Sequence, residues 1–341
     1  MADVSDAALL EAQSVATALV GAPVDLARIL AAGRNSRIYK VRSGEQTFAL
    51  KQYPSRTHDP RDRLSTEVGA LRLMERSAVD NVPRVVGVDR QHGYALLTWI
   101  EGVDVGELRE ADIDAAVAFL TAIHRLRREP RAADQPLAAE ACLAGAEIER
   151  QIKARLAQLR KLQGERELID FIDDSFVPEL TRRLAEARLA ASAAGLDFAT
   201  ELPQEWWSLV PADFGFHNSL RRGDGSLAFV DFEYFGWDDP VKLTADILLH
   251  PGRPLSPPQR HRFHAAAVGV YGEDPIFERR LGAYLPLFAL RWVLILLNEF
   301  IPERWQRRVL AGDSASWSDA KVRQLNRARG FLATVPQKVD A

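Results

Sequence analysis

The sequence predicts an α+β fold in two lobes, a small antiparallel sheet followed by a mainly helical region. Up to about residue 98, short apolar runs are separated by turn residues, a pattern typical of strands and hairpins. Farther along, apolar residues recur at helical spacing, and alanine, leucine, glutamate and arginine dominate residues 137–194. A chain of 341 residues is long enough for two lobes. We therefore expect an N-terminal lobe over residues 1–98, and a hinge with a helical C-terminal lobe over residues 99–341.

Five strands and one helix are predicted in the N-terminal lobe. They comprise two strands within residues 28–41, a third strand at 47–53, a helix at 61–76, and a hairpin formed by 84–91 and 94–99. Leu64, Val68 and Leu71 give the helix an apolar face. The last strand ends near Gly102, before the change to helical periodicity, which predicts a hinge between the lobes.

Several helices are predicted in the C-terminal lobe. The expected elements are a helix within residues 104–128, two or three helices within 137–194, a proline-rich loop at 251–258, a helix from Gln259, and a buried helix at 285–301. The last of these is the most apolar part of the chain, but its longest uninterrupted apolar run has six residues. A bilayer requires roughly 20. We therefore expect this helix to be buried inside the protein.

One segment of the C-terminal lobe carries the residues with the clearest chemistry. Asp224-Gly225 lies between two short apolar runs, a strong signal for a hairpin with a two-residue turn. Symmetry about this turn would place Asn218 directly opposite Asp231, with Cβ atoms roughly 5 Å apart. Asp213 precedes Asn218 by five positions. Kinase catalytic loops have this spacing between the aspartate that accepts the substrate proton and the metal-binding asparagine.

These residue types suit phosphoryl transfer. The γ-phosphate of a nucleotide carries concentrated negative charge, which must be neutralised and held in line with the attacking hydroxyl. Amide and carboxylate oxygens are suitable ligands for a hard cation such as Mg²⁺. We therefore predict Asp213 as the catalytic base and Asn218, Asp231 and Glu233 as Mg²⁺ ligands. The alternative is a surface hairpin with ordinary Asp and Asn caps, although the joint spacing of these residues argues against it.

Upstream residues would complete a nucleotide site. Lys51 lies among apolar neighbours in the third strand, like the strand lysine that pairs with nucleotide phosphates in kinases. Glu67, in the following helix, is the candidate partner that orients Lys51, and an exposed helix glutamate is the alternative. Gly33 is the only glycine of the predicted phosphate turn, and a lone turn glycine is more often structural. Adenine would bind through backbone groups of Thr98, Trp99 and Ile100.

These residues together resemble the aminoglycoside phosphotransferase and choline kinase family, small-molecule kinases with a protein-kinase-like fold. The resemblance covers nearly the whole chain and rests on the Gly33 turn, Lys51, residues 97–102, 212–218 and 230–233, and the segment from Trp237 to Asp246. It implies a bilobal fold with ATP or GTP in the cleft between the lobes. It also implies Mg²⁺ as cofactor, Asp213 as base, Asn218 and Asp231 as metal ligands, and Lys51 as phosphate contact. One position departs from the family pattern: Pro211 replaces a histidine that mainly braces the metal loop, which bears on loop rigidity and rate.

The acceptor is expected to be a hydroxyl of a small molecule, namely a sugar, an amino sugar or an amino alcohol. Asp238, Asp239, Glu299 and Glu303 could contact an amine, although Asp239 before Pro240 is equally well explained as a turn or helix cap. A catalytically silent nucleotide-binding protein of the same fold is the first alternative. A protein kinase is the second, but the chain shows no Ala-Pro-Glu segment after Asp231.

Composition limits the location and the partners. The net charge is −3 and the pI is about 6.2, so no electrostatic case exists for nucleic acid. Cys142 is the only cysteine, which favours a reducing cytoplasm. The N-terminus lacks an apolar core flanked by basic residues, which argues against a signal peptide. We expect a cytoplasmic protein that binds neither nucleic acid nor membrane, and its oligomeric state is left open.

Overall fold

The computed structural model describes residues 2–29, 36–55, 59, 61–310 and 316–336, which form two compact units. The first unit comprises Met1–Gly106, Arg125–Pro136 and Pro211–Gly236, and the second comprises Glu107–His124, Leu137–Val210 and Trp237–Ala341. The first contains the main sheet and the second is mainly helical, so the predicted α+β class is confirmed. Because the first unit takes segments from both sides of residue 98, the predicted lobe limits stay a prediction.

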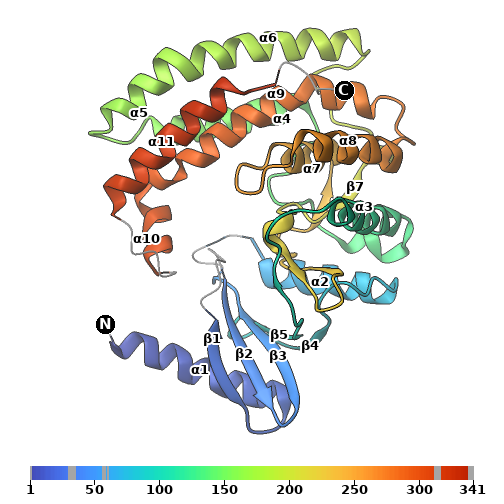
Figure 1. The fold of residues 1–341 in the computed structure, drawn as a ribbon, viewed down its shortest axis with the longest axis vertical. Coiled ribbons are helices and arrows are strands. Elements are labelled where there is room, and N and C mark those ends of the chain that lie inside the picture. Colours follow the sequence, from blue (N-terminus) through green and yellow to red (C-terminus); the bar gives the residue numbers. More distant parts are fainter. Residues whose placement is uncertain (1, 30–35, 56–58, 60, 311–315, 337–341) are drawn as a thin grey trace. The chain divides into compact units, whose positions relative to one another are not determined.

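A five-stranded antiparallel sheet forms the body of the first unit (Figure 1). Its strands are β1 (Asp25–Ile29), β2 (Arg37–Ser43), β3 (Gln46–Gln52), β4 (Val85–Asp89) and β5 (Tyr94–Thr98), in the order β1-β2-β3-β5-β4. All five predicted strands are present, although β1 begins three residues before the predicted range of 28–41 and β2 ends two residues after it. β3 lies in the middle of the sheet, which places Lys51 between Ile38 on β2 and Ala95 on β5.

Two helices lie on opposite faces of this sheet. Helix α1 (Ala2–Val20) packs against the face that carries Tyr39, Val41 and Leu50, all of them buried. Side chains alternate between the faces of a strand, so Lys51 points to the other face, where it contacts helix α2 (Arg63–Arg76). Helix α2 was predicted, whereas α1 was not, although Ala12, Val15, Ala16 and Leu19 recur at helical spacing.

A second small sheet in this unit contains the predicted hairpin, but the predicted register is wrong by one residue. The sheet consists of β6 (Val103–Asp104), β8 (Ser219–Arg221) and β9 (Leu227–Phe229), and η5 (Phe216–Asn218) precedes β8. Ser219 pairs with Phe229, and the Val230 N–H donates to the Asn218 carbonyl at 3.0 Å. Asn218 therefore faces Val230 and not Asp231.

The register differs because the loop has three residues instead of two. The Gly225 N–H donates to the Arg222 carbonyl at 2.9 Å, and Gly225 has φ of 86°. A type I turn followed by a residue in the left-handed region is the usual geometry of a three-residue hairpin loop. The extra residue moves every pair of the hairpin by one position relative to a two-residue turn.

The second unit is built around helix α9 (Figure 1), which is packed by α4, α6, α7 and α11. Its helices are α3 (Glu110–Arg125), α4 (Gly145–Leu159), α5 (Arg166–Phe171), α6 (Val177–Ala193), α7 (Pro240–Leu249), α8 (Pro257–Tyr271), α9 (Phe277–Leu296), α10 (Pro302–Leu310) and α11 (Trp317–Ala333). The π turn η3 (Ile172–Phe176) joins α5 to α6, η6 (Leu297–Phe300) extends α9, and β7 (Ser208–Val210) pairs with β10 (Gly236–Asp238).

Helix α9 with η6 is the buried apolar helix that the sequence predicted. In the part of the chain that the structure describes, Phe277–Phe300 alone is long and apolar enough to cross a bilayer, and 78% of its apolar window is buried inside the protein. Arg291 on this helix is 4% exposed and pairs with Asp246 on α7 at 3.0 Å. Most of this helix is apolar, as expected of a core helix, and this buried arginine is paired with a carboxylate.

We expect Gly145→Ala to destabilise the second unit, because α4 approaches Phe198 too closely for a side chain at residue 145. A Cβ there would lie 2.5 Å from Cδ2 and Cε2 of the Phe198 ring. Overpacking of this kind costs about 1–3 kcal/mol in the free energy of unfolding. Urea unfolding measures it. Gly282→Ala on α9 is the matched control, since nothing lies within 4 Å of its Cβ, and it should gain roughly 0.5–1 kcal/mol. Equal losses in both variants would contradict the packing argument.

Candidate functional site

Lys51 is the centre of a buried charge cluster in the first unit. Its Nζ lies 2.6 Å from Glu67 Oε2, 2.7 Å from Asp231 Oδ1 and 3.3 Å from Glu233 Oε2. The lysine side chain is 5% exposed. Burial alone would lower the pKa of Lys51, but the negative charges of Asp231 and Glu67 outweigh it and raise that pKa, so Lys51 stays a cation. The structure therefore contains an ion pair between Lys51 and Glu67.

Glu67 connects helix α2 to the sheet and to the segment after β9. Its Oε2 accepts from Lys51 and from the Tyr53 hydroxyl at 2.8 Å, and its Oε1 accepts from the Phe232 N–H at 3.1 Å. Glu67 lies on the buried face of α2 with Val68 and Leu71. Because both carboxylate oxygens are engaged, Glu67 orients Lys51 and also fixes the backbone next to Asp231.

Glu233 is held by a different set of partners. Arg63 Nη1 donates to its Oε1 at 2.5 Å, and the Ser36 hydroxyl donates to its Oε2 at 2.7 Å. Arg63 is 3% exposed and also pairs with Asp59. The sequence analysis did not select Arg63, although it precedes Glu67 by four residues and so shares its helix face.

Asp231 is the most accessible carboxylate of the cluster. Its side chain is 31% exposed, whereas those of Glu67 and Glu233 are 1% exposed. Its φ of 71° lies in the left-handed region, which aspartate tolerates better than most residues. Burial raises the pKa of Asp231, the charges of Glu233 and Glu67 raise it further, and Lys51 opposes the shift. The Asp231 carboxylate pairs with the buried Lys51 and also reaches solvent. It is therefore suited to bind a second cation that exchanges with solvent.

The loop before β8 presents Asp213 to solvent. Ala212 has φ of 61°, and the Asp213 N–H donates to the Pro211 carbonyl at 2.9 Å. A hydrogen bond across one residue in the left-handed region is a tight, strained γ-turn. The Asp213 side chain is 49% exposed and lies 3.3 Å from His217 Nε2. The turn at Ala212 therefore directs the Asp213 carboxylate towards solvent, in the loop that leads to β8.

Asn218 ties this loop together and keeps a free face for a ligand. Its Nδ2 donates to the Asp213 carbonyl at 2.8 Å. An amide that donates through its nitrogen leaves its oxygen to accept or to bind a metal. Asn218 and Asp231 thus offer hard oxygen donors, the chemistry that Mg²⁺ prefers, so these two residues fit a magnesium site.

The carboxylates of Glu67, Asp231 and Glu233 form a second group of oxygen atoms that could hold a metal ion. Their ligand atoms lie within 4.8 Å of one another. The Lys51 ammonium already occupies the centre of this group. Glu233 would have to release Lys51, Ser36 or Arg63 to bind a metal.

The other predicted site residues are distributed as follows. Gly33 lies outside the described residues. Thr98 is the last paired residue of β5, and Trp99 and Ile100 follow it outside the ladder. Asp238 and Asp239, in the second unit, are buried and paired with Lys242 and Arg280. Asp239 also accepts from the Val241 N–H at 2.9 Å, so the helix-cap interpretation holds for it.

We expect Lys51→Met to destabilise the protein by roughly 3–5 kcal/mol at neutral pH, because three carboxylates lose their shared cation. Without it, the folded-state pKa values of the buried carboxylates rise above their unfolded values. The variant then loses stability as the pH rises from about 4 to 7, and the gap to the wild type shrinks towards pH 4. Urea unfolding at several pH values measures this gap.

Lys40→Met on β2 is the matched control for this variant. Lys40 Nζ lies 3.9 Å from Glu101, whose side chain is 85% exposed. Such an exposed pair contributes less than about 1 kcal/mol. If Lys51→Met cost no more than Lys40→Met, Lys51 would not be the charge that holds the cluster together.

Several solved structures share this fold. Choline kinase LicA from Streptococcus pneumoniae superposes with a TM-score of 0.59 and 16% identity, over 94% of this chain and 97% of that one. An ethanolamine kinase from Plasmodium vivax gives 0.56 and 13%, over 90% and 84%. The spectinomycin phosphotransferase APH(9)-Ia, solved with ADP and spectinomycin, gives 0.61 and 12%, over 93% and 95%. At these identities the likeness establishes a shared protein-kinase-like fold.

Comparison of the sequence with known families leads to the same group. A search of curated proteins found no match. The model of the phosphotransferase enzyme family matches residues 27–280, a range that includes Lys51, Glu67, Asp213, Asn218 and Asp231. Since this range is well over half of the chain, the protein belongs to the phosphotransferase enzyme family.

Proposed function

We propose that this protein is a small-molecule kinase that transfers the γ-phosphate of ATP or GTP to a hydroxyl group. Family membership supports the reaction class. The observation that carries the proposal is the Lys51 cluster, because it joins a buried strand lysine to a helix glutamate and to an accessible aspartate. A purely structural ion pair would not need an exposed third member. In kinases, a lysine at this place in the sheet forms ion pairs with the nucleotide phosphates.

Asp213 is the proposed catalytic base. Its carboxylate is exposed, so an acceptor hydroxyl can reach it. The hydroxyl oxygen forms a bond to the γ-phosphorus, and its proton passes to Asp213. The bond from the γ-phosphorus to the β,γ-bridging oxygen breaks, and the nucleoside diphosphate leaves. His217, 3.3 Å from Asp213, helps to orient the carboxylate in a loop where Pro211 replaces the family histidine.

Lys51, Asn218 and Asp231 are the proposed phosphate and metal contacts. Lys51 would pair with the nucleotide phosphates, and its contacts to Glu67 and Glu233 hold it in place. We propose Asn218 and Asp231 as the principal ligands of Mg²⁺, because Glu233 is buried and both of its oxygens are engaged. Bound Mg²⁺ would neutralise charge that develops on the phosphates. Thr98, Trp99 and Ile100 would hold adenine through backbone groups, since the chain leaves the β-ladder there.

The proposed acceptor is a sugar, an amino sugar or an amino alcohol. The similar structures include a choline kinase, an ethanolamine kinase and a spectinomycin phosphotransferase, which supports a small hydroxyl-bearing acceptor. Pro211 favours one second candidate, a catalytically silent nucleotide-binding protein, because it removes a brace of the metal loop. Turnover of wild-type protein decides between the two.

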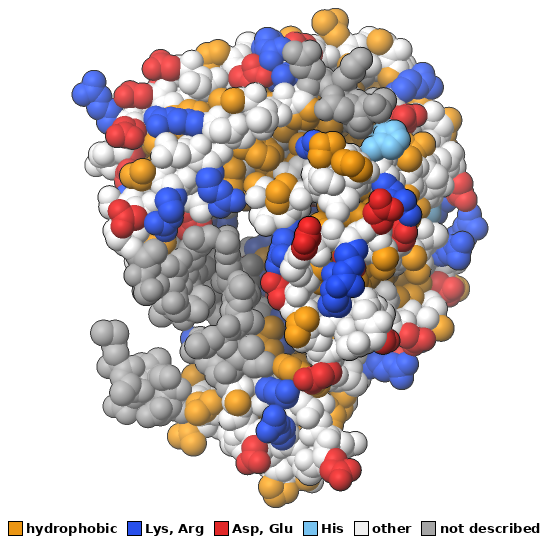
Figure 2. Space-filling model, in the orientation of Figure 1, with side chains coloured by type: hydrophobic (Ala, Val, Ile, Leu, Met, Phe, Trp, Pro, Cys, Tyr) orange, Lys and Arg blue, Asp and Glu red, His pale blue; other side chains and the backbone are white. Residues whose placement is uncertain are grey.

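We further propose a cytoplasmic protein without nucleic-acid or membrane partners. Figure 2 shows acidic and basic side chains intermingled on the face in view, and the net charge is −3. The single cysteine, Cys142, is buried, and burial raises the pKa of its thiol to about 12. Such a thiol stays protonated and unreactive, which suits a protein that has no need of a disulfide.

Asp213→Asn should abolish most turnover while leaving nucleotide binding intact. A general base contributes about 10²- to 10⁴-fold to rate, so kcat should fall by that factor. The Kd for Mg·ATP should stay within a few-fold, because Asp213 touches the acceptor and not the nucleotide. A coupled assay of nucleotide consumption, run over a broad acceptor panel, measures kcat, and calorimetry measures Kd.

Asp224→Asn is the matched control, since Asp224 is an exposed aspartate in the hairpin loop of the same segment. It should leave kcat unchanged. If wild-type protein turned over no acceptor faster than Asp213→Asn while both bound Mg·ATP, the protein would be the silent binder.

Asp231→Asn should weaken Mg·ATP binding far more than adenosine binding. Asparagine is chosen because it tolerates the positive φ of this position, so the backbone is kept. Loss of the carboxylate removes a metal ligand, and we expect at least a tenfold rise in Kd for Mg·ATP, equal to about 1.4 kcal/mol. Titrations with Mg·ATP and adenosine measure both values. Equal losses for the two ligands would mean that Asp231 acts on the fold and not on the metal.

A further inference from the structure

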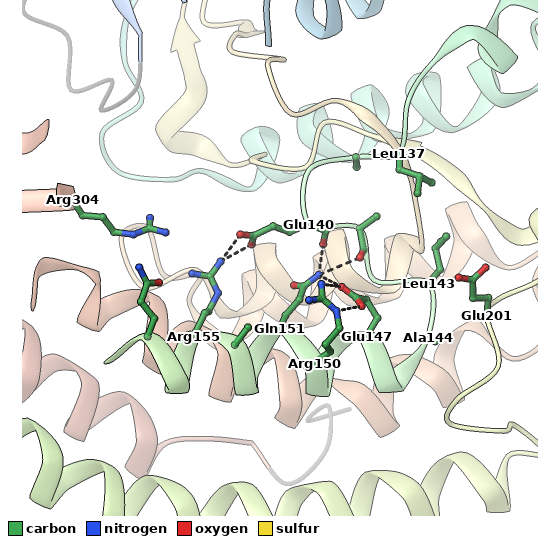
Figure 3. A pocket seen from close by; sticks show the side chains of 14 residues that line it. Leu137, Glu140, Leu143, Ala144, Glu147, Arg150, Gln151, Arg155, Glu201 and Arg304 are labelled. Atoms are coloured by element: carbon green, nitrogen blue, oxygen red, sulfur yellow. Dashed lines mark hydrogen bonds and ion pairs between the residues drawn. The ribbon is translucent and has the colours of Figure 1, made fainter. Parts of the chain in front are cut away.

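The second unit contains a cavity of about 520 Å³ along helix α4. This volume falls in the range of small-molecule sites. Figure 3 shows the lining side chains of α4 directed towards the 137–144 segment, with Arg304 at one end and Glu201 at the other. The opposite face of α4 carries Ile148, Ile152 and Leu156 and is buried in the core. The polar face of this helix thus lines a hollow instead of a convex surface.

The lining combines leucine and alanine side chains with charged groups that are electrically balanced. Its charged members are Glu140, Glu147, Glu201, Arg150, Arg155 and Arg304. Three carboxylates therefore face three guanidinium groups. Arg150 contacts Glu147 through Nε at 2.6 Å and Nη2 at 2.7 Å, and Arg155 contacts both oxygens of Glu140 at 2.7 and 2.6 Å. A ligand with a net charge of either sign would meet an equal number of like charges here.

The wall of the cavity is held in a strained shape. Glu140 has φ of 55°, in the left-handed region that non-glycine residues rarely adopt. Gln151 is buried, with 6% of the residue exposed. Its side-chain Nε2 donates to the carbonyls of Glu140 at 3.1 Å and Ala141 at 3.2 Å. Arg291 donates to Gln151 Oε1 at 3.1 Å. Strained residues that their surroundings hold in place gather at ligand sites, and here the strain sets the position of a charged lining residue.

The groups that remain available are both donors and acceptors. Arg155 uses only Nη2 on Glu140, so among the described residues its Nε and Nη1 hydrogens can serve another acceptor. Each carboxylate oxygen has two lone pairs and can accept from a hydroxyl while it stays paired to arginine. Burial opposes ionisation of Glu140, but Arg155, Arg291 and Lys242 together lower its pKa, so it remains an acceptor. A hydroxyl group suits a lining of paired arginines and carboxylates, because it can donate and accept hydrogen bonds without adding charge.

The lining also argues against two classes of ligand. Quaternary ammonium groups are recognised over aromatic faces. None of the described residues that line this cavity is aromatic. A polycationic amino sugar would need an excess of carboxylates, which the balance of three against three does not provide.

From the balanced lining, the strained wall and the missing aromatic side chains, we propose that the α4 cavity binds a neutral polyhydroxylated molecule, a sugar or a polyol. This inference goes beyond the proposed function, because it concerns a binding site within the second unit alone. The binding itself can be tested without turnover.

Saturation-transfer NMR with a library of neutral hexoses, pentoses, hexitols and cyclitols tests the proposal, with kanamycin and choline chloride as charged comparators. Calorimetry then gives Kd for each binder, with and without Mg·ADP. We expect neutral compounds to bind and the two cations not to bind. Ala154→Trp would fill the cavity from α4, because Ala154 lines it, and should weaken binding at least tenfold. Ala157→Trp, an exposed position of the same helix outside the lining, is the matched control and should bind like the wild type.

Three results would overturn the proposal: no binding of any neutral compound, binding of kanamycin or choline alone, or full binding by Ala154→Trp. These results are distinct from failure of the proposed function. A wild type that binds a neutral sugar at this cavity without phosphorylating it keeps the site and loses the reaction. Phosphorylation of an acceptor by a protein that binds no neutral compound keeps the reaction and loses the site.

Discussion

The first unit depends on one buried ammonium group, the Nζ of Lys51, which three carboxylates surround. A buried charge costs free energy unless it is paired and hydrogen-bonded, so Lys51 and its partners must all be in place for the fold to be stable. Lys51 lies on β3, and its three carboxylate partners come from α2 and from the segment after β9. This requirement brings residues 180 positions apart in the sequence into contact. The cluster that a phosphate and a metal would use is thus also a cluster that holds the unit together.

Buried ion pairs recur in the second unit, where they position helices. Arg291 on α9 pairs with Asp246 on α7, and Arg280 on α9 pairs with Asp239 at the start of α7. Such pairs are weak evidence for stability, because desolvation offsets much of their attraction. Their hydrogen bonds are directional, however. Arg291 donates to Gln151, and Gln151 donates to the carbonyls of residues 140 and 141 in the wall of the α4 cavity. Helix packing and the shape of the cavity are therefore coupled by one arginine.

Backbone strain marks the same places. Ala212 next to the candidate base, Asp231 in the candidate metal site and Glu140 in the cavity wall all have positive φ. A non-glycine residue in this region costs roughly 1–3 kcal/mol and persists only when neighbouring contacts over-determine it. Each of the three has such contacts, through Asp213 N–H, Lys51 and Gln151 respectively. Ala78, after α2, also has positive φ and lies outside these places, so positive φ by itself does not identify a site.

The sequence by itself determined the α+β class, the five strands, helix α2 and the buried helix α9, because hydrophobic periodicity and turn residues act locally. It also selected Lys51, Glu67, Asp213, Asn218 and Asp231, because their residue types and spacing are unusual together. Only the tertiary structure decided the register of the β8–β9 hairpin, where one extra loop residue places Asn218 opposite Val230. It alone revealed Arg63 as a partner of Glu233 and the balanced lining of the α4 cavity. The hairpin register depends on the loop conformation, which Asp224-Gly225 does not fix alone. The Arg63–Glu233 pair and the cavity lining depend on contacts between segments far apart in the sequence, which periodicity and turn residues do not encode.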